Sequence, residues 1–183
     1  NNLVVGLPAA GQSPAALYNM VGHCVNLLPI RSEVNGDITF SDYIKQRKKS
    51  MFDAFDHQEF TMGSLLNKLP LQRDPSRIPL VPVVFNVDLG ITNGVNFEGL
   101  TYEFVSNPRK YENFEMFVNA TGMGDKLMVE CTYNTDLFDA AMIEQRMKEF
   151  VVMLEGIVEQ TDAPLKYLPV LTQDEKQKLF IDW

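Results

Sequence analysis

Two histidines and two cysteines hold most of the potential for covalent or metal chemistry in this sequence: His23, His57, Cys24 and Cys131. His23 and Cys24 are adjacent, so on a strand their side chains point to opposite faces of the sheet. A thiol–imidazole pair between His57 and either cysteine stays open, but nothing local favours it over buried structural cysteines. No Cys-x-x-Cys or mixed Cys/His ligand spacing occurs, so we expect no metal site.

Residues 6–11 (GLPAAG) are the stretch that most resembles a phosphate-binding loop. They lack the order G-x-G-x-x-G and the Lys-Ser/Thr ending that would cradle a phosphate. We therefore expect a tight loop of small residues. The residues alone predict no catalytic constellation.

The composition is that of an acidic globular domain. The 183 residues are 45% hydrophobic and 22% charged, and the net charge is −8. An acidic surface repels phosphate backbones, so we expect no nucleic-acid partner. No apolar run approaches the roughly 20 residues of a membrane helix, so we expect no membrane association and a cytoplasmic protein. The chain starts without Met, and we expect it to be a piece of a longer protein.

Hydrophobic periodicity predicts an α/β (α+β) fold with a mixed sheet of about five or six strands and two long helices packed on it. We expect strands at 3–7, 25–31, 80–88, 100–105, 114–121 and 126–134, the last two as a hairpin. We expect helices at 14–20, from Thr39 onward, at 62–69, at 139–160 capped by Asp139, and after Thr172. Thr172 and Glu175 have the spacing of a capping box. In the last strand one face would carry Leu127, Val129, Cys131 and Tyr133, and the other Met128, Glu130, Thr132 and Asn134.

Three ordered motifs give a family resemblance. Residues 21–31 (VGHCVNLLPIR) resemble GxFVNxLPLR, residues 56–60 (DHQEF) resemble the start of HQDYPFE, and residues 73–80 (RDPSRIPL) match RDxSRxPL at every fixed position. These are elements of the condensation domains of nonribosomal peptide synthetases. Residues 6–11, 133–138 (YNTDLF) and 168–175 (LPVLTQDE) are similar to further elements of that family. Residues 61–63 (TMG) replace the usual Pro-Phe-Glu and resemble the variant of hybrid polyketide/peptide synthetases.

The resemblance implies one lobe of a two-lobed fold of the chloramphenicol acetyltransferase type. The family's HHxxxDG motif, which belongs to the N-terminal lobe, does not occur in this sequence. We therefore expect residues 1–183 to be the C-terminal subdomain, with residues 165–183 starting the linker toward an adenylation domain. We expect no catalytic residue in this fragment, which alone would be inactive.

The implied activity belongs to antibiotic or other secondary-metabolite biosynthesis. A condensation domain forms an amide bond between a donor acyl or peptidyl thioester and an acceptor aminoacyl thioester. Both are carried on 4′-phosphopantetheine arms, and no cofactor binds the domain directly. The implied partners are the N-terminal lobe, the upstream and downstream peptidyl carrier proteins and the adenylation domain. A non-catalytic docking module and an epimerisation or heterocyclisation domain remain as alternatives.

The resemblance also assigns site residues. Val25, Asn26 and Leu28 would line the substrate tunnel, where Asn26 either bonds a substrate or pantetheine amide or satisfies a buried backbone group. We expect His57 to cap carbonyls at a helix end. The side chains of Arg31, Arg73, Asp74 and Arg77 have oppositely charged partners nearby in the sequence, and we expect them to hold loops in place through ion pairs. The motif residues expected to be structural are Gly22, Arg31, His57, Gln58, Arg73, Asp74, Ser76 and Arg77.

Overall fold

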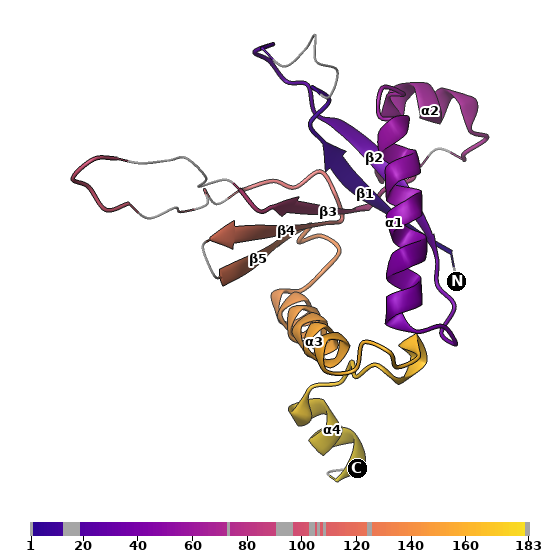
Figure 1. Cartoon of the computed structure of the whole chain (residues 1–183), viewed down its shortest axis with the longest axis vertical. Coiled ribbons are helices and arrows are strands. Elements are labelled where there is room, and N and C mark those ends of the chain that lie inside the picture. Colours follow the sequence, from indigo (N-terminus) through magenta and orange to yellow (C-terminus); the bar gives the residue numbers. More distant parts are fainter. Residues whose placement is uncertain are drawn as a thin grey trace. The chain divides into compact units, whose positions relative to one another are not determined.

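The computed structural model describes residues 2–12, 19–72, 74–90, 97–102, 105, 107, 109–123 and 126–181, and Figure 1 shows the chain. Within these residues the elements confirm a mixed α/β fold, with five strands and four α-helices. In chain order they are β1 Asn2–Ala9, β2 Asn26–Glu33, α1 Phe40–Asp56, α2 Met62–Lys68, β3 Val83–Asp88, β4 Met116–Met123, β5 Lys126–Tyr133, α3 Ala140–Glu159, the 3-10 helix η2 Leu165–Tyr167 and α4 Gln173–Phe180. Among the described residues, no helix is long and apolar enough to cross a membrane.

The chain divides into two compact units. One comprises Asn1–Val4, Ile30–His57 and Leu137–Trp183, and the other comprises Val5–Pro29 and Gln58–Asp136. The two long helices, α1 and α3, belong to the first unit. Strands β3, β4 and β5 belong to the second, which therefore holds the central part of the sheet.

The sheet has the strand order β2-β1-β3-β4-β5. β3 pairs in parallel with β1 and with β4, and β4 pairs with β5 in an antiparallel hairpin. The hairpin predicted from the sequence is confirmed over eight residue pairs. Val84 of β3 is fully buried, and Val118 and Ala120 of β4, which pair with Phe85 and Val87, are buried on the other face of the sheet. Their burial places the second unit's core at the centre of the sheet.

β3 begins at Val83, later than the predicted strand start, and the preceding prolines explain the delay. Leu80 has a φ of 70°, a left-handed conformation that leucine rarely adopts. The N–H of Val81 donates to the carbonyl of Pro79 at 2.9 Å, which closes a γ-turn around Leu80. Pro82 has no N–H to give to a sheet, so ladder pairing starts only after it.

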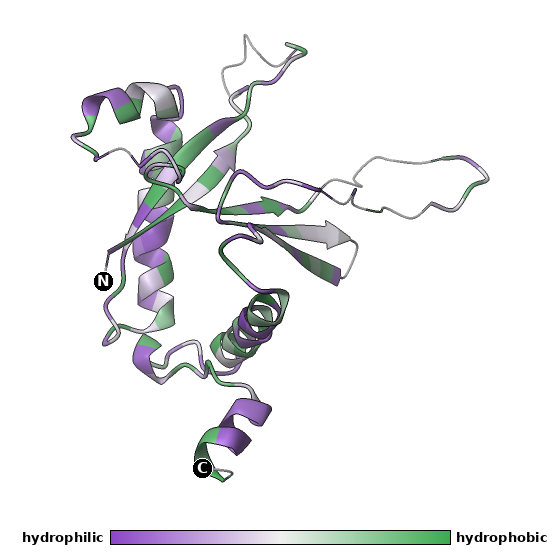
Figure 2. Ribbon diagram, turned by 180° about the vertical axis from the view of Figure 1, so that it is seen from behind, coloured by the Kyte–Doolittle hydropathy of each residue, from purple (hydrophilic) through white to green (hydrophobic). Residues whose placement is uncertain are grey.

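In the first unit, the start of α1 is tied to the segment that follows α3. Thr39 caps α1 by accepting a hydrogen bond from the Asp42 N–H at 3.1 Å, as its sequence position predicted. Leu165 N–H donates to Ile38 O at 2.9 Å, and the Lys166 ammonium pairs with Asp37 at 2.7 Å. Hydrophilic and hydrophobic residues are mixed along α1 (Figure 2), and no residue of this helix is fully buried.

The remaining sequence predictions had mixed outcomes. The capping box of Thr172 and Glu175 is confirmed at the start of α4. Asp139 is the N-cap residue of α3, as predicted, and its carbonyl accepts the Ile143 N–H at 3.1 Å, but its side chain makes no capping hydrogen bond. Leu100 closes a turn onto Phe97 O at 3.0 Å, and the described residues of 100–105 form no strand. The helix expected at 14–20 lies mostly outside the described residues.

Candidate functional site

Asn26 opens β2 and ties it to the segment between α1 and α2. Its side-chain amide N–H groups donate to the carbonyls of Gln58 at 2.7 Å and Phe60 at 3.4 Å. Its Oδ1 accepts the N–H of Leu27 at 2.9 Å. Both amide hydrogens are therefore engaged with backbone groups, which favours the backbone role of Asn26 over bonding to a substrate carbonyl. Gln58 contributes its carbonyl to this contact.

The flanking tunnel candidates differ in exposure. Val25 is 52% exposed to solvent, whereas Leu28 is 4% exposed and belongs to the core. Gly22 has no described atom within 4 Å of the place where a Cβ would stand. A side chain at position 22 would therefore meet no obstacle within the described part of this chain.

The glycine-rich stretch before these residues has a structural explanation. Gly11 has a φ of 65°, and a Cβ there would overlap the carbonyl oxygen of Cys24. The left-handed conformation and the close backbone approach both require glycine. A carbonyl oxygen repels phosphate, so the geometry agrees with a tight loop and not with a phosphate cradle.

Arg31 and His57 lie in the first unit. Arg31 donates from Nε and Nη2 to the Oδ1 of Asn2 at 3.3 and 3.2 Å, so its partner is an amide and not the expected carboxylate. The His57 Nδ1 lies 2.8 Å from the Asp53 carbonyl. A carbonyl oxygen only accepts, so Nδ1 carries the hydrogen in this contact. The ring thus satisfies a carbonyl in the last turn of α1, the capping geometry expected from the sequence.

The RDPSR motif is held by a turn and by an ion pair to β4. Asp74 Oδ1 accepts from the N–H and the hydroxyl of Ser76 at 2.9 and 2.6 Å. These hydrogen bonds hold the pKa of Asp74 below its usual range. Arg77 Nε lies 2.8 Å from Glu115 Oε1. Arg73 lies outside the described residues.

This geometry corrects the expected local pairing of Arg77 with Asp74. The carboxylate that Arg77 contacts is Glu115, immediately before β4, because the turn directs the Asp74 carboxylate to Ser76. Asp74 is exposed, and among the described residues it forms no ion pair. A cavity of about 490 Å³ lies beside the motif. It is lined by Gly63, Leu66, Asn67, Leu71, Asp74, Pro75, Arg77 and Pro79.

A second group of polar side chains covers one face of β3, β4 and β5. Asn86, Asn119 and Glu130 are in register across the three strands, as are Asp88, Thr121 and Met128. Alternate residues share a face, so Thr132 of β5 lies on the same side. We call this surface the polar face and define it by Asn86, Asp88, Asn119, Thr121, Glu130 and Thr132.

Side-chain hydrogen bonds connect the residues of the polar face within β3 and β4 and between these two strands. Asn86 Nδ2 donates to Asp88 Oδ2 and to Asn119 Oδ1, each at 2.8 Å. Asn119 Nδ2 donates to the hydroxyl of Thr121 at 3.0 Å. Thr121 is only 2% exposed, so this network closes the base of the face. A cavity of about 310 Å³ lies over it, lined by Asn86, Asp88, Asn107, Arg109, Phe117, Asn119, Glu130 and Thr132.

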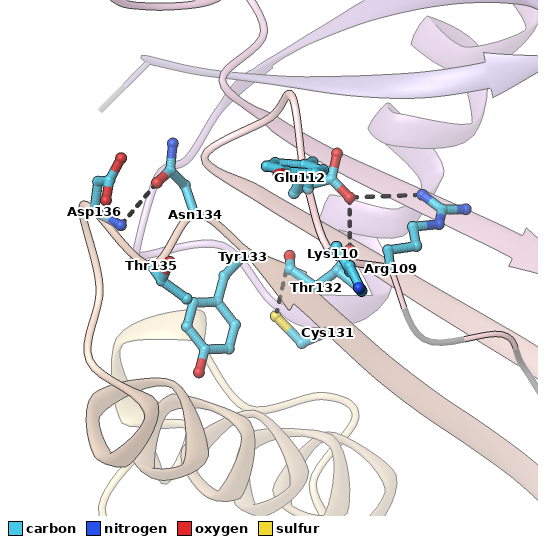
Figure 3. A pocket seen from close by; sticks show the side chains of 10 residues that line it. Arg109, Lys110, Glu112, Cys131, Thr132, Tyr133, Asn134, Thr135 and Asp136 are labelled. Carbon is cyan, nitrogen blue, oxygen red and sulfur yellow. Dashed lines mark hydrogen bonds and ion pairs between the residues drawn. The ribbon is translucent and has the colours of Figure 1, made fainter.

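An adjoining cavity of about 590 Å³ is shown in Figure 3, lined by residues 109–112 and 131–136. At its centre Glu112 accepts the hydroxyl of Thr132 at 2.8 Å and lies 3.5 Å from Arg109 Nη1. The Arg109 guanidinium also lies 5.2 Å from the ring centroid of Phe117. Burial raises the pKa of the Cys131 thiol, which disfavours the thiolate that a nucleophile needs.

The sequence predicted a third of the polar face, two of its six residues. It placed Glu130 and Thr132 on one side of their strand but assigned them no role. It did not single out the pairs Asn86/Asp88 and Asn119/Thr121. The signal was present, because each pair is spaced two apart in an otherwise apolar strand.

Comparison of the whole sequence with known protein families identifies its family. The family model of the condensation domain matches residues 1–180. This chain belongs to the condensation domain family. Condensation domains are the amide-forming domains of nonribosomal peptide synthetases. The resemblance inferred from the three motifs is confirmed.

The relatives of this condensation domain chain are much longer proteins. Tyrocidine synthase 3 of Brevibacillus parabrevis is 32% identical over 182 residues, which cover 100% of this chain and 3% of that protein. Surfactin synthase subunit 1 of Bacillus subtilis (strain 168) is 31% identical over 183 residues, which cover 100% of this chain and 5% of that protein.

Solved structures show the same fold. A four-domain nonribosomal peptide synthetase bound to AMP and glycine aligns with a TM-score of 0.83 and 21% identity, over 96% of this chain and 14% of its own. The first condensation domain of the CDA synthetase aligns with a TM-score of 0.72 and 21% identity, over 93% of this chain and 38% of its own. The chain therefore has the fold of part of a condensation domain, one lobe of the chloramphenicol acetyltransferase type.

Proposed function

We propose that residues 1–183 are the C-terminal lobe of a condensation domain that joins two carrier-bound thioesters. The donor is an acyl or peptidyl thioester and the acceptor is an aminoacyl thioester. In the reaction a C–N bond forms at the donor carbonyl, the C–S bond breaks, and the amine proton ends on the released thiol. The main support is that the family model covers residues 1–180, while the chain spans only 38% of a solved condensation domain.

The partner of this lobe is an N-terminal lobe that supplies HHxxxDG, since this sequence contains no His-His pair. Large apolar side chains in the segment between β3 and β4 support such a partner. Leu100 and Val105 are each 73% exposed, and Tyr111 is 91% exposed. Several strongly exposed large apolar side chains in one segment are typical of a surface that another domain covers. Without that lobe, the chain is expected to form no amide.

The carriers bring their substrates on 4′-phosphopantetheine arms, which enter a tunnel beside the start of β2. Val25 is our candidate for the tunnel wall because it is half exposed, and Asn26 fixes the strand behind it. Leu28 would support this wall from the core. Residues 165–183 begin the linker toward an adenylation domain. The exposed apolar end of α4, Leu179 and Phe180, supports contact with a following domain.

A reconstitution assay tests this function. The chain would be assayed alone and together with the N-terminal lobe of its own protein, each with loaded donor and acceptor carrier proteins. Mass spectrometry of the acceptor carrier should show the amide product with both lobes and only spontaneous aminolysis with the chain alone. Amide formation by the isolated chain would overturn the assignment of a half active site.

The same assay separates the alternatives. Carrier binding without any product would indicate a docking module. A product lighter by one water than the simple amide would indicate heterocyclisation. An acceptor residue with inverted configuration and no new amide would indicate an epimerisation domain.

A further inference from the structure

We infer that Asn35 is a site of covalent modification, at which the side-chain amide is lost and the backbone rearranges to isoaspartate. Asn35 lies shortly after the end of β2 and is exposed, and Gly36 follows it in a turn. In an Asn-Gly pair the backbone nitrogen of the glycine can attack the side-chain carbonyl carbon, because glycine has no Cβ to obstruct the approach. The reaction is independent of the proposed function and needs only water.

The turn holds the reacting groups in a favourable arrangement. Asn35 Oδ1 accepts the N–H of Asp37 at 3.0 Å, which folds the Asn35 side chain forward along the chain. Negative charge develops on Oδ1 during the attack, and the Asp37 N–H is placed to stabilise that charge. Among the hydrogen bonds of the described residues, none has the Gly36 N–H as its donor. The attacking nitrogen is therefore not engaged elsewhere in this part of the chain.

The reaction passes through a cyclic imide. The Gly36 nitrogen gives up its proton and forms a C–N bond to Asn35 Cγ, the bond from Cγ to the side-chain nitrogen breaks, and ammonia leaves with that proton. Water then adds to the resulting succinimide. Opening at the Cγ carbonyl gives aspartate, whereas opening at the main-chain carbonyl gives isoaspartate, in which the main chain runs through Cβ and Cγ. Either product replaces a neutral amide by a carboxylate and adds a negative charge.

The rearranged backbone lies against the segment that follows α3. Lys166 N–H donates to Gly36 O at 3.0 Å, and Leu165 N–H donates to Ile38 O at 2.9 Å. A Cβ on Gly36 would stand only 3.2 Å from Lys166 Cβ, so the two segments are in close contact. Isoaspartate lengthens the main chain by a methylene group immediately before Gly36, and a contact this close cannot keep its register. We therefore expect the modification to release the start of the proposed linker.

The chain contains a matched reference site for this chemistry. Asn134 forms the same kind of turn, in which its Oδ1 accepts the Asp136 N–H at 2.8 Å, but the residue that follows it is Thr135. A β-branched side chain crowds the nitrogen that would attack, so Asn134 should react slowly. The variant Thr135→Gly removes this obstacle and should make Asn134 reactive.

The test follows both sites in one sample of the intact condensation domain, incubated at mildly alkaline pH. Trypsin releases residues 32–45 and 127–146 as separate peptides, each with a single asparagine. Mass spectrometry measures the mass gain of the amide-to-acid change, and methyltransferase labelling detects isoaspartate. We expect Asn35 to convert at least about tenfold faster than Asn134, which corresponds to an activation barrier lower by about 1.4 kcal/mol. Thr135→Gly should bring the conversion of Asn134 close to the rate of Asn35.

Hydrogen exchange measures the structural consequence. The isoaspartate form would be separated by ion exchange and compared with the unmodified protein and with Asn35→Asp, which adds the charge but keeps the normal backbone. We expect the amide hydrogens of Leu165 and Lys166 to exchange about tenfold faster in the isoaspartate form alone, because the carbonyls that accept them are displaced.

Three results would overturn the inference. Conversion of Asn35 no faster than that of Asn134, or no acceleration by Thr135→Gly, would contradict the modification site. Unchanged exchange at Leu165 and Lys166 in the isoaspartate form would contradict the release of the segment. Equally fast exchange in Asn35→Asp would show that the charge, and not the longer backbone, is responsible.

Discussion

Gly156 of α3 lies against Pro169, and its replacement by alanine sets two effects against each other. Alanine is favoured over glycine in a helix interior by about 1 kcal/mol. A Cβ at this position would overlap Cγ and Cδ of the Pro169 ring, and Gly156 itself is buried. A proline ring cannot rotate aside, so the helix or the segment around Pro169 must move, and overpacking of this kind costs about 1–3 kcal/mol.

The steric cost should exceed the helix gain, so we expect Gly156→Ala to lower the free energy of unfolding by about 1 kcal/mol or more. For a chain of this length that lowers the melting temperature by about 2–4 °C per kcal/mol. The matched variant is Gly63→Ala in α2, where the nearest atom to the new Cβ is Thr61 Oγ1 at 4.0 Å. It should stabilise the chain by up to about 1 kcal/mol.

Both variants would be compared with the parent chain by thermal and urea unfolding followed by circular dichroism. The reasoning predicts shifts of opposite sign for the same chemical change in two helices. If Gly156→Ala stabilised the chain as much as Gly63→Ala, the contact with Pro169 would not be the close packing described above.

Three further predictions concern the motif residues and a thiol. Asn26→Ala should lower the free energy of unfolding by about 1–2 kcal/mol in urea titrations, since the carbonyl of Gln58 loses its donor; an unchanged midpoint would contradict this. Hydrogen bonds from Ser76 lower the pKa of Asp74 in the folded chain. The ionised Asp74 carboxylate therefore stabilises the fold above the unfolded-state pKa of about 3.9, and this stabilisation is lost as the pH falls through the lower pKa of the folded state. Ser76→Ala should raise the pKa of Asp74 in an NMR titration of the side-chain carboxyl, and no change would refute the assigned cause. Burial raises the pKa of Cys131, so iodoacetamide should modify it more slowly than an unfolded peptide thiol at pH 8, with the difference lost in denaturant.

Most of the fold was predictable because its signals are local. The caps at Thr39 and Thr172 and the helical periodicity of α3 depend on residues within a few positions of one another, and the structure has them. The late start of β3 was indicated only in outline, because the γ-turn at Leu80 combines two prolines with a backbone conformation that leucine seldom adopts.

The candidate site was harder to predict because it depends on pairings between distant segments. The motif around Asp74 was found, but its ion pair runs from Arg77 to Glu115, and no spacing rule connects those two positions. The polar face exists only once β3, β4 and β5 are in register, which aligns Asn86 with Asn119 and Glu130. Each strand shows its own alternation of polar and apolar residues, but a single sequence does not say which strands become neighbours.

The order of the strands also has a consequence for how this sheet assembles. The β4–β5 ladder begins where Met123 meets Lys126, so it closes a very short loop, whereas Gly6 of β1 must find Val84 of β3 across nearly half the chain. The entropy cost of closing a loop rises with its length, and local hairpins form within microseconds. The hairpin can therefore form as soon as both arms are free, with β3 joining next and β1 last. During synthesis β1 is made long before β3, so of its two neighbours in the sheet only β2 is available to pair with it early.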